Sequence, residues 1–105
     1  MRGRPLGSQV RQNIIEILYF LKSAHGYKIY EIYKNIFPSV SIRNIYYHLN
    51  KGEEIGEFEV EKIKKEKGDY SWGSDAEKIY YKLGPKASPT NNEKARLFLK
   101  NEGYI

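Results

Sequence analysis

The segment from Ser41 to Lys51 holds the side chains best suited to chemistry with another molecule. On a helix of 3.6 residues per turn, its apolar residues would share one buried stripe. The stripe would comprise Ile42, Ile45, Tyr46 and Leu49. The opposite face would then carry Ser41, Arg43, Asn44, Tyr47, His48 and Lys51, with no acidic residue among them.

These residue types suit recognition of DNA. Arginine pairs with guanine and asparagine with adenine, while serine, tyrosine and lysine can hold phosphates. We therefore expect a helix that enters a DNA groove, against the alternative of an ordinary solvated helix face. The residues expected to face bases are Arg43, Asn44, Tyr47 and His48, and those expected at phosphates are Ser41 and Lys51.

A second basic segment lies between two predicted strands and contains Lys62, Lys64, Lys65 and Lys67. A basic wing of this kind can lie along the DNA backbone or the minor groove. Acidic residues interleave with these lysines, so a solvated loop is the alternative. Trp72, in the same segment, is expected in the core.

The N-terminal residues Arg2-Gly3-Arg4-Pro5 resemble the core of an AT-hook. Such a segment lies extended in the narrow minor groove of A·T-rich DNA, where the negative potential attracts arginine. The resemblance implies minor-groove contacts by Arg2, Arg4 and Pro5. A plain disordered terminus is the alternative.

Signatures of an enzyme are missing from the sequence. There is no cysteine, and the glycines form neither a phosphate-binding loop nor a dinucleotide-binding motif. His25 and His48 do not have the spacing of metal ligands, and no nucleophile has a base beside it. We expect neither catalysis nor a cofactor nor a bound metal, and we expect His25 to assist a turn.

The charge is concentrated in the first half of the chain. Of the 105 residues, the first 52 hold eight Lys/Arg against two Asp/Glu, a charge of +6, and the remainder holds ten against eleven, a charge of −1. This excess favours a polyanionic partner, although a solvated Lys/Glu surface is the alternative. With no signal peptide and no apolar run of about 20 residues, the expected location is the cytosol or its nucleoid, with no membrane partner.

Periodicity predicts the elements that must position these residues. Helices are expected from Ser8 to about Ser23, from Tyr27 to Phe37 and from Ser41 to Lys51, with serine caps and a stop at Pro38. Strands are expected near residues 57–60 and 78–83, joined by a long mobile tip, with a bulge or an early end of the first strand at Ile63. A linker and a last short helix, from Asn91 or Asn92 to near Gly103, complete the chain.

This order predicts an α+β fold, a winged helix-turn-helix of three helices, a two-stranded β-hairpin wing and a short C-terminal helix. The expected boundaries are a flexible basic arm over residues 1–7, the winged-helix domain over 8–84, and the linker and short helix over 85–105. DNA binding, an architectural DNA-coating role and a winged-helix module for protein interaction all remain open at this point.

Three motifs resemble the PadR-like winged-helix regulators: His25 to Tyr30, Asn44 to Leu49 and Ile79 to Gly84. The similarity covers about residues 9–84. It implies a DNA-binding transcription regulator, generally dimeric and often a repressor, with the third helix in the major groove of double-stranded DNA.

The chain departs from the family pattern in three places. Tyr47 stands where the family often has proline, and the segment Lys51 to Gly56 replaces a Leu-x-x-x-Gly-Leu-Ile turn. The long dimerisation helix of the family is reduced to about ten residues, which leaves little chain for an effector pocket. Phe98 and Leu99 are expected to dock on the first helix or on the same helix of a second subunit, as in a homodimer.

Overall fold

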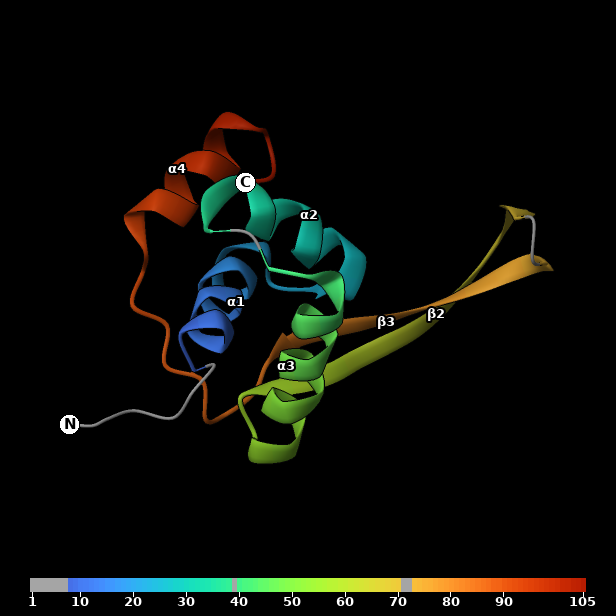
Figure 1. Ribbon diagram of the computed structural model, residues 1–105, viewed down its shortest axis with the longest axis horizontal. Coiled ribbons are helices and arrows are strands. Elements are labelled where there is room, and N and C mark those ends of the chain that lie inside the picture. Colours follow the sequence, from blue (N-terminus) through green and yellow to red (C-terminus); the bar gives the residue numbers. More distant parts are fainter. Residues whose placement is uncertain (1–7, 39, 71–72) are drawn as a thin grey trace.

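The computed structural model describes residues 8–38, 40–70 and 73–105, with the side chains of residues 8, 65–70 and 73–77 not described. Its elements follow one another from α1 to α4 along the chain (Figure 1). They are α1 (Ser8–Leu21), β1 (Ala24–His25), α2 (Gly26–Ile36), α3 (Ile42–Ile55), β2 (Phe58–Tyr70), β3 (Gly73–Leu83) and α4 (Glu93–Asn101). The predicted arm 1–7 and Trp72 lie outside the described residues.

The first two helices form where the sequence predicts them. α1 buries Ile14, Ile17 and Leu18 on one stripe. α2 begins at Gly26 because Nδ1 of His25 accepts a hydrogen bond from the backbone N–H of Lys28, which caps the helix. It ends before Pro38, as predicted.

The third helix is longer than the sequence indicates. Ser41 caps it as predicted, its Oγ accepting from the backbone N–H of Asn44 at 3.1 Å. The helix does not end at Lys51 but continues to Ile55, where Gly56 adopts a left-handed conformation with φ of 89°. Gly52 is therefore an interior helix residue, and a Cβ there would lie 2.2 Å from Cδ2 of Phe58. Close packing by this ring, and not helix termination, explains the glycine.

The sheet has the strand order β1-β3-β2 with antiparallel pairing throughout. The hairpin of β2 and β3 projects from the helices as a long two-stranded arm (Figure 1). Its strands extend through most of the segment predicted to be a mobile tip. The short β1, which the sequence analysis missed, pairs Ala24 and His25 with Tyr81 and Tyr80. Of the two alternatives at Ile63, the strand does not end there, and a bulge lies two residues earlier, between Val60 and Lys62.

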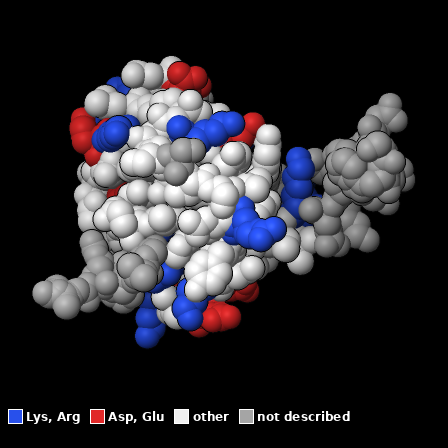
Figure 2. All heavy atoms as spheres, viewed as in Figure 1, with Lys and Arg blue, Asp and Glu red and all other residues white. Residues whose placement is uncertain are grey.

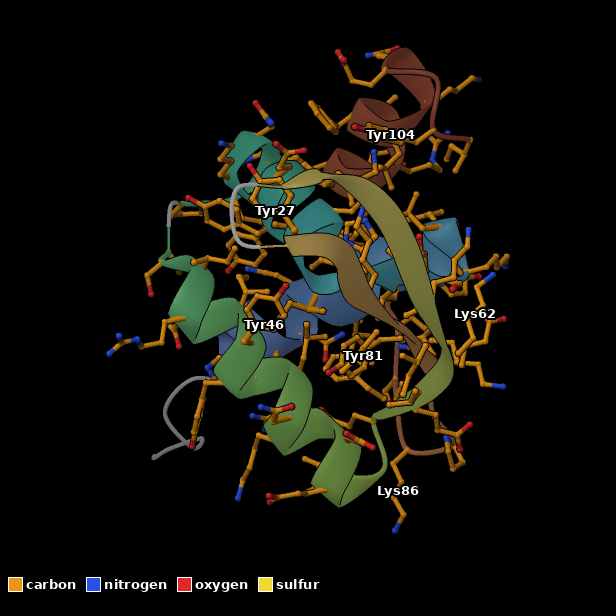
Figure 3. All side chains as sticks on the ribbon, turned by 90° about the vertical axis from the view of Figure 1, so that its right-hand side faces the viewer. Tyr27, Tyr46, Lys62, Tyr81, Lys86 and Tyr104 are labelled. Carbon is orange, nitrogen blue, oxygen red and sulfur yellow. The ribbon has the colours of Figure 1, made fainter. Side chains whose placement is uncertain are left out.

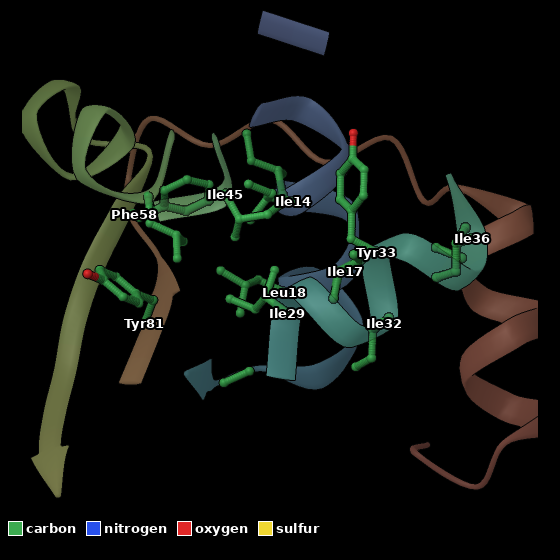
Figure 4. Close-up of a cluster of buried hydrophobic side chains, with 14 of the residues drawn as sticks. Ile14, Ile17, Leu18, Ile29, Ile32, Tyr33, Ile36, Ile45, Phe58 and Tyr81 are labelled. Carbon is green, nitrogen blue, oxygen red and sulfur yellow. The ribbon is translucent and has the colours of Figure 1, made fainter. Parts of the chain in front are cut away.

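The core fills the space between the three N-terminal helices and the base of the hairpin (Figure 4). α4 covers the side of α1 and α2 with the buried residues Ala95 and Leu99. The linker before α4 is fixed by Glu16 on α1, whose carboxylate accepts hydrogen bonds from Thr90 and Asn92. Asn92 caps α4, in agreement with the sequence. Among the helices of the described residues, none is long and apolar enough to cross a membrane.

Candidate nucleic-acid interface

The outward face of α3 presents a run of polar and aromatic side chains to solvent. Arg43, Tyr47, Asn50 and Lys51 are exposed and Asn44 is half-buried. Tyr47 is the most open of the α3 aromatics, with 58% of its surface exposed. Most of the polar residues predicted for this face therefore lie on it. Ser41, at the start of the helix, is also exposed while its Oγ caps α3.

His48 does not belong to this face, which corrects the sequence prediction. Its side chain is 3% exposed, whereas Tyr46, predicted to be buried, is 41% exposed. The buried stripe consists of Ile45, His48, Leu49 and Gly52, a spacing of i, i+3, i+4, i+7. The prediction placed the polar histidine outside, and this rotated the inferred stripe by part of a turn.

A buried polar network explains the position of His48. Nη1 of Arg11 lies 3.3 Å from Nδ1 of His48, and Nε of Arg11 donates to Oε1 of Glu57 at 2.9 Å. Burial, together with the positive charge of Arg11, lowers the pKa of His48 below its usual value of 6.5. The histidine is therefore a neutral packing residue at neutral pH. Nothing in the sequence spacing links residues 11, 48 and 57.

Tyr46 turns from α3 towards the hairpin (Figure 3). Its ring crosses the start of α2, where a Cβ on Gly26 would lie 2.3 Å from Cε1 of the ring. Tyr81, on the central strand, lies beyond it on the same side of the hairpin. Burial raises the pKa of Tyr81, and the nearby Glu53 and Tyr46 add to this effect. Tyr46 thus packs between α2, α3 and the base of the hairpin.

Acidic residues enter α3 only in its last turns. The longer helix brings in Glu53 and Glu54, and Nζ of Lys51 lies 3.8 Å from Oε1 of Glu54. The carboxylate-free surface therefore extends from Ser41 to Asn50 and ends at Lys51. On the face shown in Figure 2, basic groups lie over α3 and the base of the hairpin, with acidic atoms near the end of α3.

The described wing lysines lie apart from the α3 surface. Lys62 and Lys64 are exposed, and their Nζ atoms lie 5.1 and 5.8 Å from the centroid of the Tyr80 ring. Figure 3 shows Lys62 pointing away from α3. The other predicted contacts, Arg2, Arg4 and Pro5 in the arm and the side chains of Lys65 and Lys67, lie outside the described part.

Within the described residues, no three side chains of the histidine, cysteine, aspartate or glutamate type gather in a way that could hold a metal ion. The two histidines have other surroundings. His25 caps α2 and stacks edge-on against Tyr80, and His48 contacts Arg11. The predicted role of His25 at a turn is consistent with its capping of α2.

No family model matches the chain, and no curated protein matches it. Among solved structures, the chain is similar to the crystal structure of Bacillus subtilis PadR in complex with operator DNA, with a TM-score of 0.54 and 20% sequence identity. The similarity covers 90% of this chain and 46% of that chain, so this chain spans less than half of the PadR length. At this identity the likeness establishes the fold, and the predicted α+β winged helix-turn-helix is confirmed.

Proposed function

We propose that this protein is a DNA-binding transcription regulator that inserts α3 into the major groove. The observation that carries the proposal is the exposed, carboxylate-free face of α3 from Ser41 to Asn50. The structural neighbour was crystallised with operator DNA, and the sequence motifs resemble the same family. The formal charge of +5, concentrated before residue 53, suits a polyanionic partner.

The side chains divide into two roles. Arg43, Asn44 and Tyr47 face base edges, with Arg43 able to pair bidentately with guanine. Ser41, at the N-terminus of α3, and Lys51, on its exposed face, hold phosphates. The arm residues Arg2, Arg4 and Pro5 extend into the adjacent minor groove, and Lys65 and Lys67 follow the backbone from the wing. Such a protein acts in the cytoplasm, at the nucleoid.

A homodimer would place two α3 helices on one face of the DNA. α4 leaves Leu97 exposed, and the residues after it leave Tyr104 and Ile105 exposed, which offers an apolar surface for a second copy. Under two-fold symmetry the half-sites would lie about 34–36 Å apart, or a multiple of this.

Selection of bound fragments from a random DNA pool tests the proposal most directly. A sequence-specific regulator enriches a defined motif, a dimer enriches an inverted repeat, and the arm enriches A·T-rich flanks. Binding should fall with salt, with a log–log slope of about −0.9 per neutralised phosphate. Salt-dependent binding without an enriched motif would indicate an architectural protein. Absence of DNA retention would indicate a protein-interaction module and contradict the proposal.

A further inference from the structure

The hairpin has two chemically different faces because of its bulge. Val60 lies opposite Tyr81, but Lys62, two residues later, lies opposite the adjacent residue Tyr80. Glu61 is the extra residue on β2. Since side chains alternate between the faces of a strand, one extra residue turns over every later side chain of that strand.

This change of face at the bulge places apolar and basic side chains on opposite faces of the hairpin. Ile63 pairs with Ile79, on the face that also carries Tyr81 and looks towards α3. Lys62 and Lys64 join Tyr80 on the opposite face, where Figure 3 shows Lys62 directed away from α3. In a regular strand, with Glu61 itself paired to Tyr80, both lysines would instead share the face of Val60 and Tyr81. We call the surface formed by Lys62, Lys64 and Tyr80 the outer face of the hairpin.

Tyr80 holds the ammonium groups of the two β2 lysines on the outer face. Both ammonium groups lie over the Tyr80 ring, at 5.1 and 5.8 Å from its centroid, an attractive cation–π geometry. His25 packs against the same ring at 5.3 Å between centroids.

Two described carboxylates of β2, those of Glu59 and Glu61, have other partners. Glu59 lies 3.9 Å from Nζ of Lys82, and Glu61 accepts a hydrogen bond from Oγ of Ser23. In the described part of the chain, no ion pair joins Lys62 or Lys64 to a carboxylate. Lys62 and Lys64 are both exposed to solvent, which places their ammonium groups where an anionic partner can reach them.

We propose that the outer face binds the phosphate backbone of a second DNA duplex, so that one protein joins two DNA segments. The two lysines repeat every second residue, about 7 Å along the strand, and DNA presents one phosphate per about 3.4 Å of axis on each strand. They point away from α3, so a duplex seated on α3 lies on the other side of the hairpin. This inference rests on the proposed function for the first duplex only.

A capture assay tests the inference. The full chain is bound to a bead-linked duplex, excess protein is washed away, and retention of a fluorescent duplex of unrelated sequence is measured at low salt. The variant K62Q/K64Q removes the charges of the two β2 lysines and leaves Lys78, which pairs with Lys64 on β3, in place. The matched control K94Q/K100Q removes two charges from exposed lysines of α4. All three proteins should melt at similar temperatures, because these lysines are exposed.

We expect wild type and the control to capture the second duplex, and K62Q/K64Q to capture roughly tenfold less while holding the first duplex as wild type does. Equal capture by K62Q/K64Q would overturn the inference and would point to bridging by a protein dimer. A parallel loss of both duplexes would also overturn it, because the lysines would then serve the duplex on α3. A chain that binds the first duplex but captures no second one refutes this inference alone. A chain that binds neither refutes the proposed function as well.

Discussion

The guanidinium of Arg11 on α1 contacts the buried ring of His48 on α3, with Nη1 3.3 Å from Nδ1. A guanidinium can only donate hydrogen bonds, so Nδ1 is the acceptor and the ring proton resides on Nε2. The same guanidinium donates through Nε to Glu57, just before β2. One side chain therefore ties α1, the proposed recognition helix and the base of the wing together.

Replacing Arg11 by methionine should destabilise the fold. The change leaves the Glu57 carboxylate and Nδ1 of His48 without their partner in a partly buried site, which costs about 1.5–3 kcal/mol of unfolding free energy. Urea denaturation of wild type and variant measures this loss of unfolding free energy. The control is Arg96→Met, which breaks the exposed Arg96–Glu93 pair on α4 and should cost less than about 1 kcal/mol. Equal losses in the two variants would contradict a structural role for Arg11.

The lowered pKa of His48 predicts that stability falls in mild acid. In the unfolded chain this histidine takes up a proton near pH 6.5, whereas in the folded protein burial and Arg11 delay protonation to lower pH. Below pH 6.5 the unfolded state binds more protons, so stability declines as the pH falls towards the folded pKa and is fully present above about pH 7. Unfolding free energies measured between pH 5 and 8 test this.

The control for this pH dependence is His48→Asn, whose Oδ1 can replace the acceptor but does not titrate. Its stability is expected to change less with pH than that of wild type between pH 6.5 and 5.5, whatever its absolute value. An unchanged slope would assign the effect to another group.

The helix order, the caps at Ser41 and Asn92 and the hairpin could be predicted from the sequence. These features depend on local periodicity and on nearby backbone groups. The features that were predicted wrongly or missed share one physical cause, namely contacts between residues that are distant in the chain. His48 is buried because Arg11 supplies a partner, and α3 continues through Gly52 because Phe58 packs on it. The two-residue β1 forms only because β3 lies beside it.

Arg43→Ala should weaken binding to the selected DNA motif by about 1–3 kcal/mol and relax the preference at one base position. The reason is loss of a bidentate pair with a base, without a change in the fold, since the residue is exposed. Fluorescence anisotropy with the motif and with single-base variants measures the effect. An equal loss for every sequence would make Arg43 a phosphate contact.

Gly52→Ala should lower stability although alanine favours helices by about 1 kcal/mol over glycine. A Cβ at this position would lie 2.2 Å from Cδ2 and 2.5 Å from Cε2 of Phe58, and Phe58 is fully buried. Displacing a core ring costs about 1–3 kcal/mol, which outweighs the gain. Thermal melting measures the net effect of the gain in helix propensity and the cost of displacing the Phe58 ring. A variant more stable than wild type would show that the ring moves freely.

Glu16→Gln should loosen the linker and α4. The Glu16 carboxylate accepts hydrogen bonds from N and Oγ1 of Thr90, from N of Asn92 and from Nε2 of Gln12, at 2.8–3.0 Å. Burial alone would raise its pKa, but these bonds outweigh burial and lower the pKa below 4.5. The carboxylate therefore contributes stability above about pH 4.5, and this contribution is lost as the pH falls through the folded pKa.

A glutamine amide turns a donor towards groups that are themselves donors, so the loss should be about 1.5–3 kcal/mol at pH 7. Hydrogen exchange should rise first over residues 84–101, because the linker is released before the core of α1 to α3 opens. Glu93→Gln, at an exposed site on the same linker–helix segment, is the matched control and should leave the exchange of the linker unchanged. Uniform exchange across the whole chain in Glu16→Gln would mean that α4 does not open separately from the winged helix.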